Sequence, residues 1–271
     1  MSLRLLRQAL LPQGMQLSVA VSIVQDEYRE MSQKAEIVIS KVEASLIECR
    51  NVSKYYDQER AVDHLDLTVS HGERLLIVGP NGSGKSTLIN LIGGLIRPTK
   101  GTVHISGLNI HKASPEVRAL IGIHTHNPFL YEDLTGKENL VFFGKLFGVP
   151  DVLSKIAEIA SLFNVNHLLD RRVSSLSHGN RKRLGLARTI LHDPKIILLD
   201  EPDSGLDSAS LVELQETLGT GIATKTILLT THNIDWGLPL ATSVLVLKNG
   251  NLALKTSPED YGTLSSIKQQ V

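Results

Sequence analysis

The chain has 271 residues, with 28 Lys and Arg against 28 Asp and Glu, so its formal net charge is zero. This balance argues against a basic nucleic-acid-binding surface, and the single cysteine, Cys49, excludes an intrachain disulfide framework. No stretch reaches the roughly 20 apolar residues that a membrane-spanning helix needs. We therefore expect a globular protein of a reducing compartment, with one large domain or two small ones and no nucleic-acid partner.

Residues 1–43 differ in character from the rest of the chain. Arg4 and Arg7 precede a short apolar run at 17–24, and charged residues follow it. A secretory signal is disfavoured because no small-residue cleavage pattern follows the run, and a membrane-surface helix would be short. We interpret 1–43 as an N-terminal extension, either poorly ordered or the product of a start assigned upstream of Met31, and 44–271 as the folded domain.

The domain is expected to open with β-strands. Residues 45–49 are strand-like, and the alternation in 65–69 is typical of a half-buried antiparallel strand. His71 and Gly72 then turn the chain into the next strand. Tyr56 lies just upstream, where an aromatic ring could stack on an adenine or pack in the core.

A phosphate-binding loop follows the apolar strand 75–78. Its nine residues fit the pattern G-x-x-x-x-G-K-[ST], and the next residues carry Leu88, Leu91, Ile92 and Leu95 at helical spacing. Glycines let backbone N–H groups turn onto phosphate oxygens at the start of a helix, where the helix dipole favours negative charge. The lysine would reach the outer phosphates, and the serine hydroxyl after it would bind Mg²⁺. The loop residues are Gly79, Pro80, Asn81, Gly82, Ser83, Gly84, Lys85, Ser86 and Thr87.

The middle of the chain is expected to be helical. Short strands are indicated at 102–105 and 119–123, after which all five phenylalanines fall between Phe129 and Phe163. Leu140, Phe143 and Phe147 share one helical face, and 152–163 carries a second apolar face. We expect a helical subdomain at about 128–180, whose aromatic residues form either its core or a docking surface.

A second apolar strand ends in two adjacent carboxylates, Asp200 and Glu201. Strand alternation should send the two side chains in different directions, so they can have different roles. Asp200 matches the acidic residue that holds Mg²⁺ in phosphate-loop NTPases, and Glu201 would polarise the attacking water.

Between these landmarks, Leu176-Ser177-His178-Gly179-Asn180 resembles the Leu-Ser-Gly-Gly-Gln signature of ATP-binding cassette (ABC) ATPases, with departures at His178 and Asn180. Residues 204–207 resemble the D-loop of that family, which ends in Asp207, and His232 resembles its switch histidine. Tyr56 lies where the family places an adenine-stacking aromatic. The resemblance runs from about Leu46 to the C-terminus, with the motifs in family order.

The resemblance implies an α/β phosphate-loop NTPase fold with a mixed sheet core, an N-terminal antiparallel β subdomain and an inserted helical subdomain. It implies ATP and Mg²⁺ as cofactors and head-to-tail pairing, as a homodimer or with a second ABC ATPase domain. Ser177 and Gly179 would then bind the γ-phosphate held by the partner. Ser177 would also cap a helix whose free N–H groups face that anion.

The resemblance further implies a peripheral subunit on the cytoplasmic face of the cell membrane, bound to an integral membrane permease. Residues 126–135 and 201–207 are similar to the ATP-binding subunit of the haem exporter of cytochrome c maturation. The main expectation is thus ATP hydrolysis coupled to haem export. The alternatives are a drug, antibiotic or lipid exporter, and a soluble ABC ATPase outside transport, which would need two cassettes or a long coiled coil.

His126 stands where the family usually has a glutamine that senses the γ-phosphate. Histidine binds Mg²⁺ poorly, so a contact to the phosphate or through water is expected. Histidines gain a proton near neutral pH, which removes the acceptor lone pair. We predict that ATPase activity falls as the pH falls through neutrality, and that His126→Gln flattens this limb while keeping activity. Superimposable acidic limbs in the two pH–rate profiles would assign the titration elsewhere, for instance to His232, and leave His126 as a packing residue.

Overall fold

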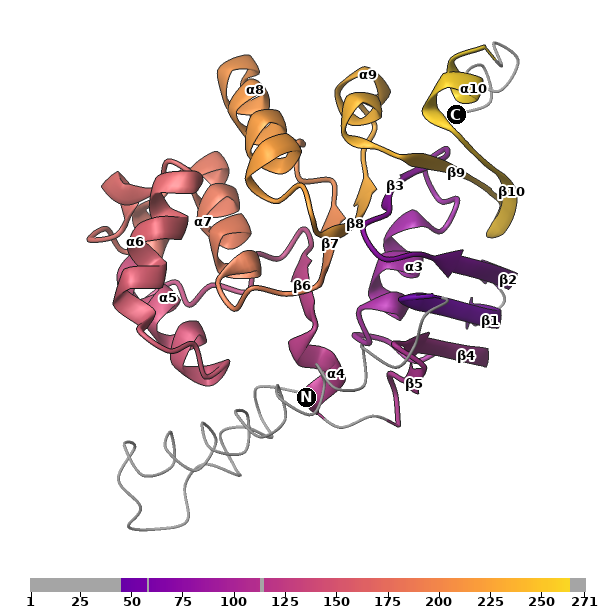
Figure 1. Ribbon diagram of the computed structural model, residues 1–271, viewed down its shortest axis with the longest axis horizontal. Helices are drawn as coiled ribbons and strands as arrows, with labels where there is room; N and C mark the ends of the chain where they lie inside the picture. Colours follow the sequence, from indigo (N-terminus) through magenta and orange to yellow (C-terminus); the bar gives the residue numbers. More distant parts are fainter. Residues whose placement is uncertain (1–44, 58, 113–114, 264–271) are drawn as a thin grey trace.

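The computed structural model describes residues 45–57, 59–112 and 115–263. The N-terminal extension expected at 1–43 lies outside the described residues. The described part of the chain folds around two β-sheets (Figure 1). Within it, no helix is both long enough and apolar enough to span a bilayer.

The first sheet is antiparallel, with strand order β2-β1-β4-β5. Its strands are β1 (Ile47–Tyr56), β2 (Glu59–Val69), β4 (Lys100–Ile105) and β5 (Leu108–Asn109). Leu65, Leu67 and Val69 of β2 are buried, and Asp66 and Thr68 between them are exposed. The expected half-buried antiparallel strand is therefore confirmed, because its alternation places one face on the core.

The second sheet has six strands in the order β10-β9-β3-β8-β7-β6. Strands β9, β3, β8, β7 and β6 run parallel, and β10 is antiparallel to β9 at the edge. Among the parallel strands, β8 lies between β3 and β7. The strands are β3 (Arg74–Val78), β6 (Ile121–His124), β7 (Ile196–Asp200), β8 (Thr226–Thr230), β9 (Ser243–Lys248) and β10 (Asn251–Thr256).

Helices cover the sheets. They are α3 (Lys85–Ile92), α4 (Pro115–Ala119), α5 (Gly136–Leu146), α6 (Val152–Leu162), α7 (His178–Ile190), α8 (Ser208–Glu216), α9 (Ile234–Gly237) and α10 (Pro258–Thr263). Short 3₁₀ turns occur at Asn166–Leu168, Val173–Ser175 and Leu238–Leu240, and a π-helical segment, Thr217–Gly221, continues α8.

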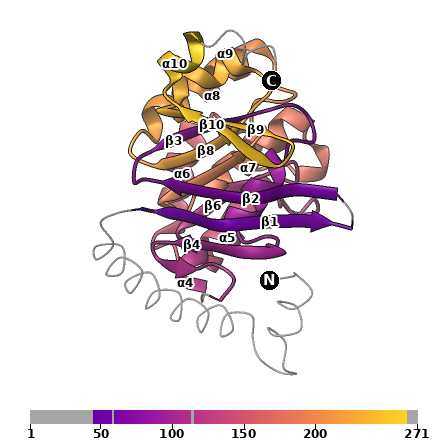
Figure 2. The same ribbon diagram turned by 90° about the vertical axis from the view of Figure 1, so that its right-hand side faces the viewer.

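Two apolar cores lie on opposite faces of the parallel sheet. On one face, Leu75 and Ile77 of β3 pack with α3 and the antiparallel sheet. On the other, Leu76 and Val78 pack with residues of α5, α6, α7, α8 and α9. In Figure 1, α5, α6 and α7 lie at the left and the antiparallel sheet at the right, and Figure 2 shows the antiparallel sheet beside the parallel one. Burial of both faces explains why these strands are continuous apolar runs.

Two element boundaries differ from the sequence expectation. Helix α3 ends at Ile92 rather than continuing to Leu95, because Gly93 and Gly94 follow and Gly94 adopts a left-handed φ of 67°. Leu95 is consequently 47% exposed. The strand expected at 119–123 begins only at Ile121, since Ala119 closes α4.

Candidate nucleotide-binding site

The loop between β3 and α3 needs glycine for steric reasons. Gly82 and Gly84 have left-handed φ angles of 77° and 101°. A Cβ at Gly84 would collide with the backbone carbonyl of Ala61 on β2, so no larger residue fits there. Gly84 is also the residue from which α3 starts, so the N-terminal N–H groups of α3 open directly behind the loop. Pro80 and Asn81 at the loop tip are exposed.

Lys85 lies inside this loop, with the whole residue only 6% exposed. Its Nζ donates hydrogen bonds to the carbonyl oxygens of Gly79 at 2.7 Å and Pro80 at 3.1 Å. Burial lowers the pKa of the ammonium, and the nearby carboxylates of Glu201 and Asp200 partly oppose that shift. The loop therefore holds a desolvated cation, and a cation in such a place is suited to binding phosphate.

Asp200 joins three elements at the carboxyl edge of the parallel sheet. It ends β7 and is buried, and its Oδ1 accepts hydrogen bonds from the Ser86 hydroxyl at 3.0 Å and the Thr230 hydroxyl at 2.7 Å. Ser86 belongs to α3, and Thr230 ends β8. A hydroxyl oxygen and a carboxylate oxygen thus lie within hydrogen-bond distance behind the phosphate-binding loop.

The carboxylate of Glu201 contacts different side chains from that of Asp200, and the Glu201 backbone does not continue the strand. Strand β7 ends at Asp200, and Glu201 has a left-handed φ of 49°. Its backbone N–H donates to the carbonyl oxygen of Thr230 at 3.1 Å and to the hydroxyl of Thr230 at 3.0 Å. A non-glycine residue adopts left-handed φ and ψ angles only where its surroundings hold it there. The conformation of Glu201 is therefore imposed by its contacts.

Two histidines face the Glu201 carboxylate. His232 Nε2 lies 2.9 Å from Oε1, and His126 Nε2 lies 3.8 Å from Oε2. The Glu201 side chain is 17% exposed, against 66% for His126 and 50% for His232. The structure therefore brings together the three residues that the sequence suggested for catalysis.

Other candidate residues make local contacts. Tyr56 is 46% exposed, with the Lys54 ammonium 5.0 Å from its ring centre. Ser177 caps α7, where its Oγ accepts from the Asn180 N–H at 3.3 Å, and Gly179 lies in the first turn. Asp207 caps α8 by accepting from the Ser210 N–H at 2.8 Å, a bond that lowers the pKa of its carboxyl group. Adenine stacking by Tyr56 and nucleotide contacts by the other three stay predictions.

Sequence reasoning missed residues that hold the candidate catalytic groups in place. Thr230 bonds both Asp200 and Glu201, and Thr231 donates to a carboxylate oxygen of Asp203 at 2.6 Å. Burial raises the pKa of Asp203. The two threonines directly precede His232, and hydroxyl side chains at the end of a buried strand could have indicated that they hold nearby carboxylates. The sequence around Lys182 carries no comparable indication.

The sequence pattern of the ABC transporter family matches residues 62–204, more than half of the chain. The chain belongs to the ABC transporter family. It is an ATPase domain of the ABC type, and both the predicted fold class and the resemblance to this family are confirmed.

Curated relatives are about a third identical to this ABC domain over the residues that align. The ATP-binding protein NatA of Bacillus subtilis is 33% identical over 74% of this chain and 83% of its own length. The bacitracin transport ATP-binding protein BcrA of Bacillus licheniformis is 32% identical over 80% and 71%. ABC transporter A family member 8 of Arabidopsis thaliana is 31% identical over 87% of this chain, which spans only 27% of that protein.

Solved structures agree with this assignment. An ATP-binding subunit of an ABC transporter superposes with a TM-score of 0.74 at 25% identity, covering 83% of this chain and 95% of its own. A bacterial ABC transporter cassette, solved as a dimer, gives a TM-score of 0.72 at 27% identity over 78% and 98%. One of the relatives named here is a bacitracin transport protein, and none is named for haem export. These relatives therefore give no support to the expected haem cargo.

Proposed function

We propose that this ABC domain is the ATP-hydrolysing subunit of a membrane exporter, lying on the cytoplasmic face of the membrane against a permease subunit. The observation that carries the proposal is the meeting of the phosphate-binding loop, Asp200, Glu201 and His232 at one sheet edge. This arrangement supplies phosphate binding, a metal-binding carboxylate and a base for water in one site.

Each residue has a proposed part in hydrolysis. Lys85 and the loop N–H groups bind the outer phosphates. Ser86 and Asp200 would hold Mg²⁺, and their oxygens suit this ion, which supplies charge neutralisation when bound. Glu201 polarises the attacking water, and His232, 2.9 Å away, orients that carboxylate.

A second copy, or another ABC ATPase domain, is proposed to complete each site. Ser177 and Gly179 lie at the N-terminus of α7, where Ser177 is exposed and helix N–H groups are available to an anion. A similar cassette has been solved as a dimer, which supports this proposal. Ser177 and Gly179 would then contact the γ-phosphate bound by the facing loop.

The proposed contact with the permease is an aromatic cluster on α5 and the segment before it. The cluster consists of Tyr131, Phe142 and Phe143, whose ring centres lie 5.2–6.1 Å apart. Phe142 is 40% exposed, and the buried Arg188 guanidinium lies beneath the Phe143 ring at 5.2 Å. Phe163, which the sequence placed with these residues, is buried in the core and does not contribute to this surface. Phe142 is the exposed ring of this cluster, and aromatic side chains are frequent anchors in protein interfaces.

Phe142→Asp is expected to release the protein from membranes that carry its permease while the basal ATPase rate stays within about two-fold, because the change lies at the rim of the aromatic cluster. Membrane sedimentation and ATPase assays measure the two effects. Val212→Asp on α8, also at an exposed apolar residue (56%), is the control and should leave membrane binding unchanged. Equal membrane binding by the Phe142 variant would contradict the docking role.

The cargo proposed for the exporter is a drug, antibiotic or lipid, supported by relatives named for bacitracin transport and daunorubicin resistance. Haem export is the second candidate and rests on the sequence similarity of residues 126–135 and 201–207 alone. The purified complex with its permease should show ATPase stimulation by its own cargo. Stimulation by haem, and not by amphiphilic antibiotics or lipids, would reverse this order. Stable activity without any membrane partner in cells would favour a soluble role.

A further inference from the structure

Lys182 leaves the second turn of α7 and ends among backbone oxygens near the active site. Its Nζ donates to the carbonyl oxygen of Glu201 at 2.8 Å and to the carbonyl oxygen and hydroxyl of Ser204 at 2.6 and 2.7 Å. An ammonium group has three donors, so all of them can be satisfied here. Lys182 is only 6% exposed, so these hydrogen bonds lie in the protein interior.

The carbonyl that Lys182 holds belongs to the proposed base itself. Glu201 has a left-handed backbone, and its N–H is held from β8 by Thr230. Lys182, on α7, holds the carbonyl group of the same residue. Ser204 strengthens this turn, since its hydroxyl donates to the Glu201 carbonyl at 3.2 Å. The direction of the carboxylate therefore depends on contacts from two different elements.

This arrangement is costly for a residue that only fills space. Burial lowers the pKa of the Lys182 ammonium, and the charges of Asp203, Glu201 and Asp200 oppose the shift. An apolar side chain of similar volume would avoid the desolvation cost of the ammonium. The three hydrogen bonds of Lys182 fix the turn after β7, which an apolar side chain of the same size could not do.

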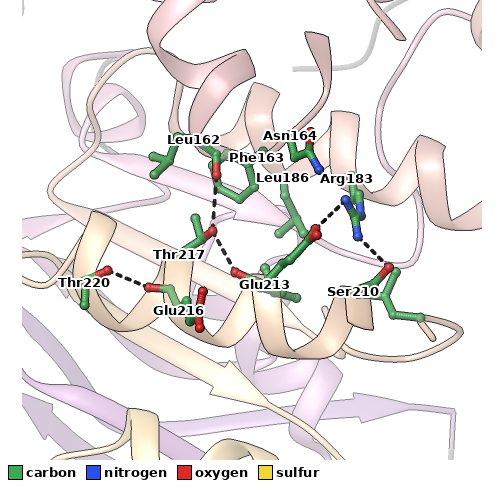
Figure 3. Close-up of a pocket in the computed structure, with 12 residues that line it drawn as sticks. Leu162, Phe163, Asn164, Arg183, Leu186, Ser210, Glu213, Glu216, Thr217 and Thr220 are labelled. Carbon is green, nitrogen blue, oxygen red and sulfur yellow. Dashed lines mark hydrogen bonds and ion pairs between the residues drawn. The ribbon is translucent and has the colours of Figure 1, made fainter. Parts of the chain in front are cut away.

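A second residue of α7 attaches the far end of the same segment. Arg183 contacts the Ser210 hydroxyl at 2.5 Å and the Glu213 carboxylate at 2.8 Å, both on α8 (Figure 3). The segment from Glu201 to Ser210 is thus tied to α7 at both of its ends. Because Ser177 caps α7, a shift of the N-terminus of this helix would be passed to Glu201 through the contacts of Lys182.

We propose that Lys182 is a positioning residue that couples the N-terminus of α7 to the orientation of Glu201. The proposal rests on the proposed function of Glu201 as the base. In a dimer, contact of Ser177 and Gly179 with the partner's nucleotide would then set the geometry of the base in the same chain. Lys182 links the two ATP sites without touching either nucleotide.

Lys182→Met tests this coupling, because methionine fills the space but donates no hydrogen bond. We expect kcat to fall about ten-fold or more, while KM for ATP and the ATP-binding stoichiometry stay within about two-fold. Lys182→Arg, which restores N–H donors, should recover part of the loss. Lys145→Met, at an exposed lysine of α5, is the control and should not change kcat. A parent-like kcat per binding site for Lys182→Met would overturn the proposal.

The pathway through Glu201 is tested in a double variant. If Lys182 acts by orienting that carboxylate, adding Lys182→Met to Glu201→Gln should lower the residual rate no further, whereas multiplied losses would show an independent role and overturn the proposal. Ser204→Ala serves where Lys182→Met does not fold: it removes one of the three bonds and should lower kcat about two- to five-fold at constant KM. An unchanged kcat for Ser204→Ala would also overturn it. Parent-like hydrolysis by Glu201→Gln would instead reject the proposed function.

Discussion

Lys85→Ala is expected to abolish ATP binding at micromolar nucleotide. The substitution removes a buried ammonium that is held within the phosphate-binding loop by two carbonyl oxygens. Hydrogen bonds to charged groups contribute about 1.5–3 kcal/mol, so the loss corresponds to roughly 10- to 150-fold in Kd. Equilibrium binding of a fluorescent ATP analogue measures the change directly.

The control for this variant is Lys137→Ala, which removes an exposed lysine from α5. It should bind the analogue as the parent does. Thermal unfolding must accompany both measurements, because Lys85 also bonds the loop backbone. A folded Lys85→Ala protein with parent-like affinity would show that the loop does not use this cation for phosphate.

Glu201→Gln is expected to keep ATP binding and to stall hydrolysis. Glutamine preserves the shape of the side chain but is a far weaker base, and loss of a general base typically costs about 10²- to 10⁴-fold in rate. The stalled protein should accumulate as an ATP-bound dimer, which size-exclusion chromatography with retained nucleotide detects. No other single substitution that spares ATP binding is expected to lower the rate as much.

Glu132→Gln provides the matched control at an exposed carboxylate that pairs with Arg181. Its hydrolysis rate should equal that of the parent, since surface ion pairs contribute little. Hydrolysis at the parent rate by Glu201→Gln would remove this residue from its role. Asp203 would then be the next carboxylate to test, since it is buried nearby and burial raises its pKa.

Much of the site follows from local sequence because its parts are strand–loop–helix units. The phosphate-binding loop, the buried strand before it and the helix after it are contiguous, and the carboxyl ends of parallel strands meet at one edge. Asp200 and His232, which lie far apart in sequence, therefore converge once β7 and β8 are recognised as neighbours. Family resemblance supplied the order of those motifs.

The supporting contacts could not be predicted because they depend on backbone conformation and long-range packing. The left-handed φ of Glu201 does not follow from its residue type, and it ends the strand alternation that the sequence led us to expect beyond Asp200. From the sequence, Lys182 is one of three consecutive basic residues, 181–183. Only the structure shows that its Nζ donates a hydrogen bond to the Glu201 carbonyl oxygen. Likewise, apolar spacing could not separate the buried Phe163 from the exposed Phe142.

We propose that each ATP site is built from two chains, and mixing two inactive variants tests this sharing. Lys85→Ala disables the phosphate-binding loop. Gly179→Asp places a negative charge where α7 would meet phosphate. A Cβ at Gly179 meets only the Leu206 side chain at 3.6 Å, so the residue fits, and Gly179→Ala is the uncharged control.

Each variant alone should hydrolyse ATP at background rates. In an equal mixture, half of the dimers pair one chain of each kind, and each such dimer holds one intact site. We expect mixing to restore about a quarter of the parent ATPase rate. A mixture no faster than the average of its two components would contradict a site shared between chains.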